Sequence, residues 1–299
     1  MTLRSYRVLT AEQVEHFVAH GYVVLHDCFT PEAARSWTDT TFTRLGYDRD
    51  DQSTWKDAVI HLPQRQLIDV KVFAPKVWDA ACDLLGGEDR IEQPYQWGDG
   101  LIVNLREGND RPWEPPSPRI KGWHKDGDWF RHFLDSPEQG LLTIILWSDV
   151  LSQGGPTYVA TDSVPVIARL LAKHPEGLHP DDFNFPELIS QCHEYVEATG
   201  KVGDVYLLHP YVLHAKSQNL LGIPRIITNP PVHLREPMRF DREDPADFSP
   251  VELAVLRGLG LERFDFQPTS PREKIVPERV ARQQKLLEEE VARAAAAAH

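Results

Sequence analysis

Two histidines and one aspartate have the residue types and the spacing to bind a transition metal. His124 and Asp126 are separated by one residue in the segment Trp-His-Lys-Asp. In an extended strand, residues two apart point to the same face, so this imidazole and this carboxylate can face one ion. His214, in a distant segment, offers a third ligand. Two histidines and one carboxylate leave open positions on a non-haem iron(II) ion, so the pattern predicts an iron site.

Asp128 is an alternative carboxylate ligand, because in an extended strand it lies on the same face as His124. A single His-x-Asp pair carries little weight in a chain with 13 histidines and 45 acidic residues. The spacing favours Asp126 over Asp128, and the interpretation depends on the second segment, which contains His214.

Arg225 adds a second kind of chemistry to this site. It follows His214 on the next predicted strand, after a turn near Gly222 and Pro224. Antiparallel pairing of these two strands would place the guanidinium beside the metal. Arginine offers a planar fork that binds a carboxylate through two hydrogen bonds. A dicarboxylate that chelates iron at one end needs such a cation at its other end, so the pattern fits a dicarboxylate cosubstrate.

Many short strands are expected to position these residues. The middle of the chain alternates apolar segments with Gly- and Pro-rich turns, which is typical of a β-sandwich or barrel. We therefore expect a mainly β fold with flanking helices. The predicted strands cover residues 22–25, 101–105, 122–126, 141–150, 157–160, 204–208, 212–215 and 225–232.

Helices are predicted on both sides of this β region. Thr10 and Gln13 form a capping-box pattern at the start of the first helix, which Gly21 ends. The composition becomes more polar after Glu236, so we expect an oxygenase domain over 1–235 and a C-terminal helical extension over 236–299. The predicted helices cover residues 10–20, 31–45, 76–85, 164–173, 250–258 and 278–297.

In their order along the chain, these motifs resemble the phytanoyl-CoA dioxygenase family of iron(II)/2-oxoglutarate-dependent oxygenases. The resemblance spans roughly residues 6–234. The family's Trp-His-x-Asp motif and its His-Pro-x-x-x-His…Gln-Asn…Arg pattern are both matched. The matching segments are residues 9–25, 123–126, 144–147, 153–156, 209–210, 214, 218–219 and 225.

The resemblance implies a fold, a ligand set and cosubstrate contacts. The fold would be a double-stranded β-helix, which is the jelly roll of the cupins. His124, Asp126 and His214 would bind Fe(II), Arg225 would bind the distal carboxylate of the cosubstrate 2-oxoglutarate, and O2 would be the second cosubstrate. Three further residues are candidates for the cosubstrate pocket: Trp147, Asn104 and Ser217. Trp147 has a core position as its alternative, because it lies in an apolar strand.

Two positions depart from the family pattern. Ala215-Lys216 replaces the Gly-Ser pair that often follows the distal histidine, so Ser217 is the candidate for the missing hydroxyl. Residues 160–163 replace a Pro-Gly-Ser-His turn. The Asp126 carboxylate matters for the outcome, because halogenating relatives have Ala or Gly there. We therefore expect hydroxylation of a small metabolite. The alternatives are desaturation, cyclisation or epimerisation at the same site, or a non-catalytic metal-binding jelly roll.

The composition excludes several other function classes. The formal net charge of −13 argues against nucleic acid and against an anionic membrane surface as partners. Cys28, Cys82 and Cys192 form no CxxC pair, so a zinc knuckle or a redox dithiol is not expected. The N-terminal segment has no apolar leader, and sparse cysteines suit a reducing compartment, so a cytoplasmic location is expected. The oligomeric state stays open.

Overall fold

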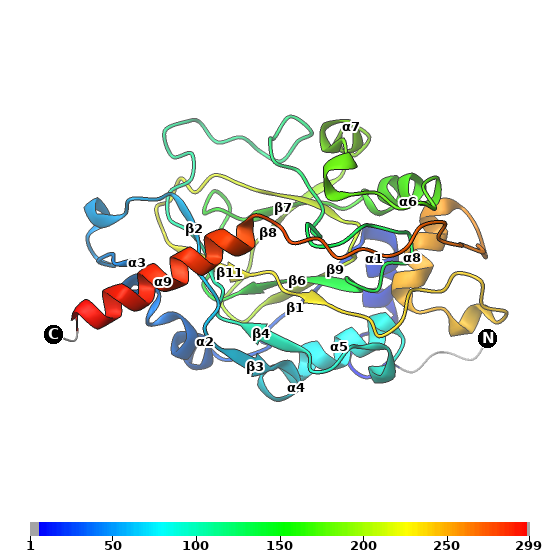
Figure 1. Ribbon diagram of the computed structural model, residues 1–299, viewed down its shortest axis with the longest axis horizontal. Coiled ribbons are helices and arrows are strands. Elements are labelled where there is room, and N and C mark those ends of the chain that lie inside the picture. The colour runs from blue at the N-terminus through cyan, green and yellow to red at the C-terminus, as the bar shows by residue number, and fades with distance from the viewer. Residues whose placement is uncertain (1–5, 298–299) are drawn as a thin grey trace.

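The protein consists mainly of antiparallel strands in two sheets with helices around them (Figure 1). The structure is a computed structural model that describes residues 6–297. The large sheet has the order β1 (Tyr22–Leu25), β9 (Val205–Leu208), β6 (Leu141–Leu146), β11 (Arg225–Thr228), β5 (Ile102–Asn104) and β2 (Val59–His61), and β12 (Pro231–Val232) pairs with β6. The small sheet has the order β10 (Leu213–Lys216), β7 (Thr157–Ala160) and β8 (Tyr195–Ala198), and β3 (Leu67–Asp69) pairs separately with β4 (Gln96–Gly98).

The chain passes back and forth between the two sheets. β5 and β6 belong to the large sheet, and between them His124 forms an antiparallel bridge to His214 of β10 in the small sheet. β7 and β8 then belong to the small sheet, β9 to the large, β10 to the small and β11 to the large. This alternation is the winding of a double-stranded β-helix, so the predicted fold class is confirmed.

β6 shows why this sequence forms a central strand. All six of its residues, Leu-Leu-Thr-Ile-Ile-Leu, are buried. A strand that is covered on both faces needs a continuous apolar run rather than an alternating one. The predicted strand over 141–150 was too long, because β6 ends at Leu146 and a turn follows at 151–154.

The segment 122–126 is not a strand, in contrast to the prediction. Its only ladder contact is the bridge between His124 and His214. Gly122 and Gly127 lie on either side of the motif with positive φ values of 87° and 123°. Residues other than glycine rarely adopt these backbone conformations, which turn the chain before and after the motif. The side chains of His124 and Asp126 therefore share a face within a short extended stretch of a loop.

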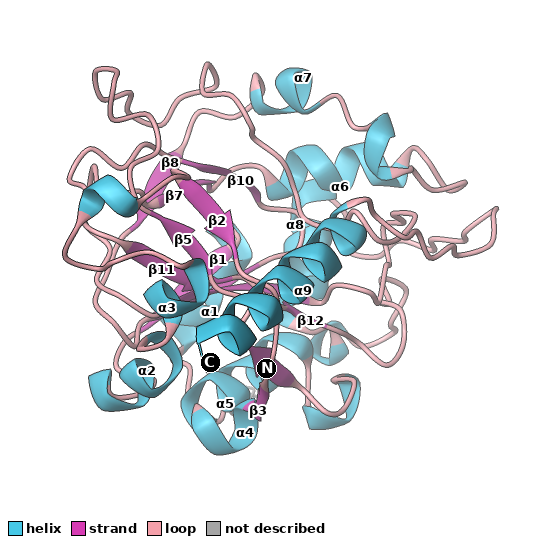
Figure 2. Cartoon of the chain, turned by 60° about the vertical axis from the view of Figure 1, so that its left-hand side comes forward, coloured by secondary structure: helices cyan, strands magenta, loops and turns pink. Residues whose placement is uncertain are grey.

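Helices flank the two sheets, and loops surround β7 and β8 (Figure 2). The capping box of Thr10 and Gln13 opens the first helix, and Gly21 ends it in the left-handed conformation, as predicted. In Figure 1, α2, α4 and α5 lie on the side of the large sheet, and α6 and α7 lie beside the small sheet. The helices are α1 (Ala11–His20), α2 (Pro31–Thr38), α3 (Thr41–Leu45), α4 (Val70–Phe73), α5 (Pro75–Leu85), α6 (Val164–Ala172), α7 (Phe185–Ile189), α8 (Pro250–Leu259) and α9 (Arg279–Ala297).

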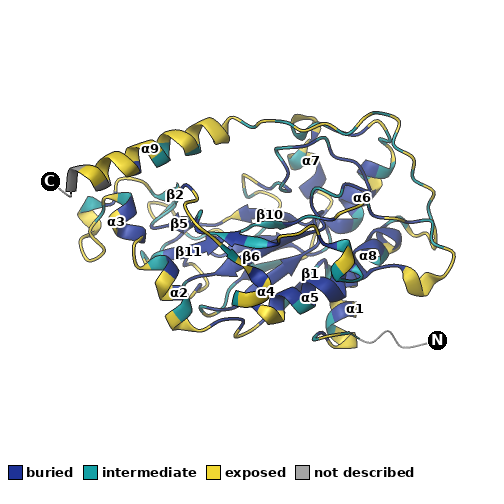
Figure 3. Cartoon of the chain, turned by 60° about the horizontal axis from the view of Figure 1, so that its bottom comes forward, coloured by how far each residue is buried: buried dark blue, intermediate teal, exposed yellow. Residues whose placement is uncertain are grey.

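The C-terminal region contacts the rest of the chain at several places. α8 packs against α1, α5 and α6. Most of α9 is exposed (Figure 3), but Glu290 is buried against Arg44. The division into 1–235 and 236–299 stays a prediction. Among the described residues, none of the helices combines the length and the hydropathy that a membrane span requires.

Glu290 should contribute more to stability than the neighbouring Glu289. Its carboxylate accepts from Arg44 Nε at 2.8 Å, and both side chains are more than 90% buried. Glu290→Ala would leave a buried N–H unsatisfied, which costs about 1–3 kcal/mol. Glu289 is exposed and lies 3.9 Å from Lys285, so Glu289→Ala should cost about 0.5 kcal/mol or less. Urea denaturation of both variants measures the difference, and equal losses would contradict this assignment.

Candidate metal centre

Three side chains from distant segments converge on one point. The ligand atoms of His124, Asp126 and His214 all lie within 4.8 Å of one another. Asp126 Oδ1 is 3.3 Å from Nε2 of His124 and 3.4 Å from Nε2 of His214. The backbone bridge holds the two histidines side by side, with N–H···O distances of 3.0 and 2.9 Å. The structure thus brings together the three residues that the sequence predicts as ligands.

Each of the three side chains is oriented by a hydrogen bond from its other polar atom. Nδ1 of His124 lies 2.8 Å from the Gly122 carbonyl, and Nδ1 of His214 lies 3.3 Å from the Val212 carbonyl. Because a carbonyl only accepts, both Nδ1 atoms carry hydrogen, and both Nε2 lone pairs are directed to the centre. Asp126 Oδ2 accepts from Asn229 Nδ2 at 2.9 Å, which leaves Oδ1 for a metal. Outer hydrogen bonds of this kind are typical of metal ligands.

The charges at the centre favour a cation. Burial would raise the pKa of Asp126, but His214 and His124 outweigh burial and hold this pKa well below its usual range. Burial would lower the pKa of His124, but the Asp126 carboxylate outweighs burial and raises it. Asp126 is therefore an anion at neutral pH. The side chain of His124 is 44% exposed and that of His214 is 7% exposed, so the centre faces solvent on the His124 side.

Asp128 points to a different partner. Its carboxylate accepts two hydrogen bonds from the Arg279 guanidinium, at 2.7 and 2.8 Å. It is absent from the group of side chains that converge at the centre. Of the two carboxylates that spacing alone allows, the structure brings Asp126 to the histidines.

Arg225 is a buried cation without an anionic partner. It is 3% exposed, and its Nε donates to the Gly155 carbonyl at 2.7 Å. Its Nη1 has no hydrogen-bond partner, and no carboxylate lies within 4.0 Å of its guanidinium in the part of the chain that the structure describes. Burial lowers the pKa of Arg225 to about 10. A buried guanidinium with an unused N–H is a site that a carboxylate would satisfy.

The pairing that positions Arg225 differs from the prediction. β11 pairs with β5 and β6 in the large sheet, whereas β10 belongs to the small sheet. Arg225 therefore lies opposite Asn104 rather than beside the His214 strand. Asn229 directly follows β11 and hydrogen-bonds Asp126, so a two-residue periodicity continued from Arg225 to Asn229 would place Arg225 on the side of the candidate centre. The short turn before Arg225 carries the chain from one sheet to the other.

Asn104 and Ser217 lie near Arg225, and their polar side chains are engaged with the backbone. Asn104 is fully buried, donates to the Ser217 carbonyl at 3.3 Å and accepts from the Glu107 amide at 3.2 Å. The Ser217 hydroxyl donates to the Pro156 carbonyl. Both residues thus support the region around Arg225. Direct contact of either residue with a cosubstrate stays a prediction.

Trp147 lies in an aromatic cluster on the opposite face of the large sheet, away from the centre. Its Nε1 donates to Thr228 Oγ1 at 2.9 Å, and its ring stacks on Trp37 of α2 at 5.6 Å. Thr228 is three residues from Arg225 on β11, so their side chains point to opposite faces. The structure therefore corrects the predicted pocket position of Trp147 in favour of its alternative, the core.

Asn229 is the residue that the sequence interpretation missed at this site. It lies at an even spacing from Arg225, so strand periodicity places both on one face. That periodicity is the signal that could have identified it, together with the chemistry of an amide, which can donate to a carboxylate ligand. Its partner Asp126 is far away in sequence, which hides the contact.

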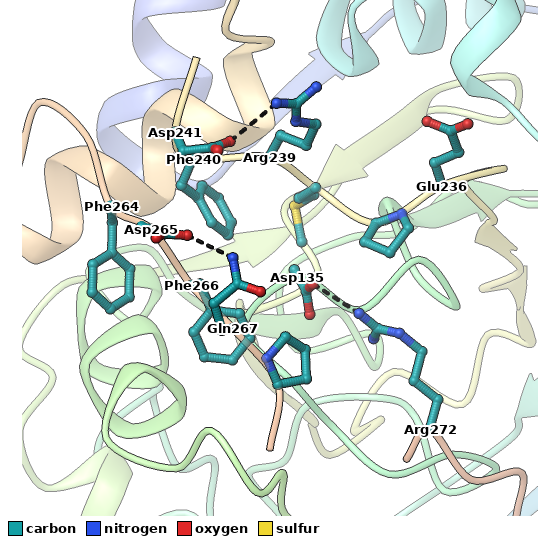
Figure 4. A pocket seen from close by; sticks show the side chains of 13 residues that line it. Asp135, Glu236, Arg239, Phe240, Asp241, Phe264, Asp265, Phe266, Gln267 and Arg272 are labelled. Atoms are coloured by element: carbon teal, nitrogen blue, oxygen red, sulfur yellow. Dashed lines mark hydrogen bonds and ion pairs between the residues drawn. The ribbon is translucent and has the colours of Figure 1, made fainter. Parts of the chain in front are cut away.

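A pocket of about 350 Å³ is lined mainly by residues of the C-terminal region (Figure 4). Phe240, Phe264 and Phe266 line it, with Asp135 and Arg272 paired at 2.7 Å. None of the three converging ligands, nor Arg225, belongs to its lining. The pocket is therefore separate from the candidate metal centre.

Comparisons with known proteins gave structural neighbours only. No family model matches the chain, and no curated protein matches it. Among solved structures, EctD from S. alaskensis with bound Fe is 20% identical, with coverage of 88% of each chain and a TM-score of 0.45. The non-heme alpha ketoglutarate dependent carbocyclase SnoK from nogalamycin biosynthesis is 15% identical, with coverage of 76% of this chain and 84% of that chain and a TM-score of 0.44. AviO1 from Streptomyces viridochromogenes Tue57 is 16% identical, with coverage of 77% of this chain and 96% of that chain and a TM-score of 0.43. Because these TM-scores lie below 0.5, the chemistry of this chain is inferred from its own residues.

Proposed function

We propose that this protein is an iron(II)- and 2-oxoglutarate-dependent oxygenase that hydroxylates a small molecule. The observation that carries the proposal is the combination of two features. One is the convergence of His124, Asp126 and His214 on a single point. The other is the buried, unpaired guanidinium of Arg225, on the strand face that also carries Asn229. The first feature fits a metal, and the second fits the far carboxylate of a cosubstrate.

The donor set fits iron(II) better than a closed structural zinc site. A structural zinc takes four protein ligands, mostly cysteine and histidine. Here three ligands converge, and the three cysteines are buried elsewhere. Two neutral imidazoles and one carboxylate on one side of an ion leave the opposite side open, which is the iron(II) oxygenase arrangement.

The buried Arg225 guanidinium fits the carboxylate of a dicarboxylate cosubstrate that does not chelate the metal. Arg225 Nε already donates to the Gly155 carbonyl, and Arg225 Nη1 remains available as a donor. An ionised carboxylate at this position would neutralise the buried cation and accept a charge-assisted hydrogen bond. A 2-oxo acid without the second carboxylate would leave the guanidinium unpaired. This selects 2-oxoglutarate over 2-oxo acids that have a single carboxylate.

The residues of the chain bind, orient and shield the reactants. Asn229 and the carbonyls of Gly122 and Val212 fix the three ligands. When bound, iron(II) and 2-oxoglutarate would couple the reduction of O2 to decarboxylation, so that one oxygen atom enters succinate and the other enters a C–H bond of the substrate. The products would be succinate, CO2 and the hydroxylated substrate. The Asp126 carboxylate occupies the position that a halide would need, which supports hydroxylation over halogenation.

We further propose that the chain belongs to the phytanoyl-CoA dioxygenase family and works in the cytoplasm on a small metabolite. The ordered motifs from Trp123 to Arg225 support the family. The net charge of −13 supports a small-molecule partner over nucleic acid. Desaturation, cyclisation and epimerisation use the same centre, so product analysis decides among them.

Anaerobic spectroscopy tests the proposed function. Iron(II) added with 2-oxoglutarate should produce a weak visible charge-transfer band that a chelator removes and that iron(II) alone does not give. Admission of O2 should then release succinate, slowly even without substrate. If neither band nor succinate appears, the oxygenase proposal is rejected. A metal-dependent thermal shift without the band would instead indicate a non-catalytic metal-binding protein.

A further inference from the structure

Lys125, between two of the proposed ligands, is buried although lysine rarely is. It is 7% exposed, and no carboxylate lies within 4.0 Å of its ammonium among residues 6–297. Because His124 and Asp126 face the metal, Lys125 points to the other side of the chain. A buried ammonium is costly unless hydrogen bonds compensate it, so its contacts identify its role.

The contacts of Lys125 lead back to the metal-binding segment. Its Nζ donates to the backbone carbonyl of Asp126 at 3.0 Å and lies 2.7 Å from Nδ1 of His132. The rings of Phe130 and Phe183 flank the ammonium, each at 5.7 Å from its centroid. The ammonium is therefore held by two hydrogen bonds and two aromatic faces.

His132 completes the arrangement. Its Nε2 lies 2.7 Å from the Gly127 carbonyl, which only accepts, so Nε2 carries the hydrogen and Nδ1 accepts from Lys125. The His132 ring also packs on Gly127, where a Cβ atom would lie 2.4 Å from Cε1. The backbone of His132 is fixed in turn by two hydrogen bonds to Leu178, at 2.8 and 2.9 Å.

We propose that Lys125 and His132 are positioning residues that hold the Asp126–Gly127 backbone so that the Asp126 carboxylate meets the two histidines. The inference rests on the proposed metal centre. Lys125 bonds the backbone carbonyl of Asp126, and His132 bonds that of Gly127, where the chain turns. This turn is not part of a strand, so no sheet ladder fixes it. Asn229 holds the carboxylate end of Asp126, and the Lys125–His132 pair holds its backbone end.

A purely structural role and a positioning role predict different results for Lys125→Met. Methionine keeps most of the apolar stem but removes the ammonium, so the metal-free variant should lose some stability, because the Asp126 carbonyl and His132 Nδ1 lose their donor. If Lys125 only fills space, cobalt(II) affinity should be unchanged at a temperature well below unfolding. If it positions Asp126, affinity should fall by about 10- to 100-fold, as for other outer partners of metal ligands.

The experiment measures cobalt(II) affinity by competition with a fluorescent chelator, together with thermal unfolding of the metal-free protein. Lys125→Met and His132→Gln should each weaken cobalt(II) binding about tenfold or more, while the metal-free proteins stay folded. His132→Gln covers the case in which Lys125→Met does not fold. Lys71→Met is the matched control, because Lys71 also lies over an aromatic ring, at 5.2 Å from that of Trp78, but is exposed on α4.

Each outcome has one meaning. Wild-type affinity in the folded Lys125 and His132 variants would overturn the positioning role while leaving the metal centre intact. Weak or absent cobalt(II) binding by the wild-type protein itself would overturn the proposed centre instead. A loss of affinity in Lys71→Met equal to that in Lys125→Met would show that lysine replacement acts through general stability, which also overturns the proposal.

Discussion

Asp126→Ala should abolish tight iron(II) binding, whereas Asp128→Ala should leave it nearly unchanged. Asp126 is the only carboxylate among the three converging side chains, and it is held anionic by the two histidines. Loss of an outer partner of a metal ligand already costs about 10- to 100-fold in affinity, so loss of the ligand itself should cost at least about a hundredfold. His214→Ala should behave in the same way as Asp126→Ala.

Asp128→Ala is a matched control, because it removes an aspartate two residues away. Asp128 pairs with Arg279 rather than with the histidines, so its loss should change iron(II) affinity by less than about threefold, the size of a surface ion pair. Anaerobic competition with a chelator measures both variants, in chloride-free buffer so that chloride does not fill the vacant position. Equal losses would show that the spacing had identified the wrong carboxylate.

The convergence of His124, Asp126 and His214 could be predicted from the sequence, because two short segments carry the signal. A two-residue spacing fixes which side chains share a face, and this holds for His124 and Asp126 even though no strand forms there. The type of each ligand then limits the metal. The position of β6 could also be predicted, because a strand that is buried on both faces requires an uninterrupted apolar run.

Contacts between sheets could not be predicted in this way. Whether Arg225 pairs with β10 or with β5 depends on which sheet the chain enters after the turn at Gly222, and no residue type marks that choice. The face on which Trp147 lies depends on the register of β6 against β11, and this register cannot be derived from the sequence. Asn229 and His132 act through partners that are distant or across a turn, so their roles emerged only from the three-dimensional contacts.

Arg225→Met should weaken 2-oxoglutarate binding by roughly 30- to 1000-fold, because removing one partner of a buried charge pair costs about 2–4 kcal/mol. Iron(II) affinity should be unchanged, since Arg225 lies outside the three converging ligands. The metal-free variant should stay folded, because removing a buried cation whose Nη1 has no partner offsets the lost hydrogen bond to the Gly155 carbonyl. Titration of the anaerobic charge-transfer band with 2-oxoglutarate measures the dissociation constant.

A second ligand turns this measurement into a specific test of the contact. 2-Oxopentanoate keeps the chelating end of 2-oxoglutarate and replaces the distal carboxylate by a methyl group. The wild-type protein should bind it about as weakly as Arg225→Met binds 2-oxoglutarate, and the variant should bind both acids equally well. Such a double-mutant cycle isolates the interaction between the guanidinium and the distal carboxylate. If the variant still prefers 2-oxoglutarate by the wild-type factor, another cation holds that carboxylate. Arg225→Lys should give an intermediate affinity, because an ammonium lacks the planar fork that bonds the Gly155 carbonyl and a carboxylate together.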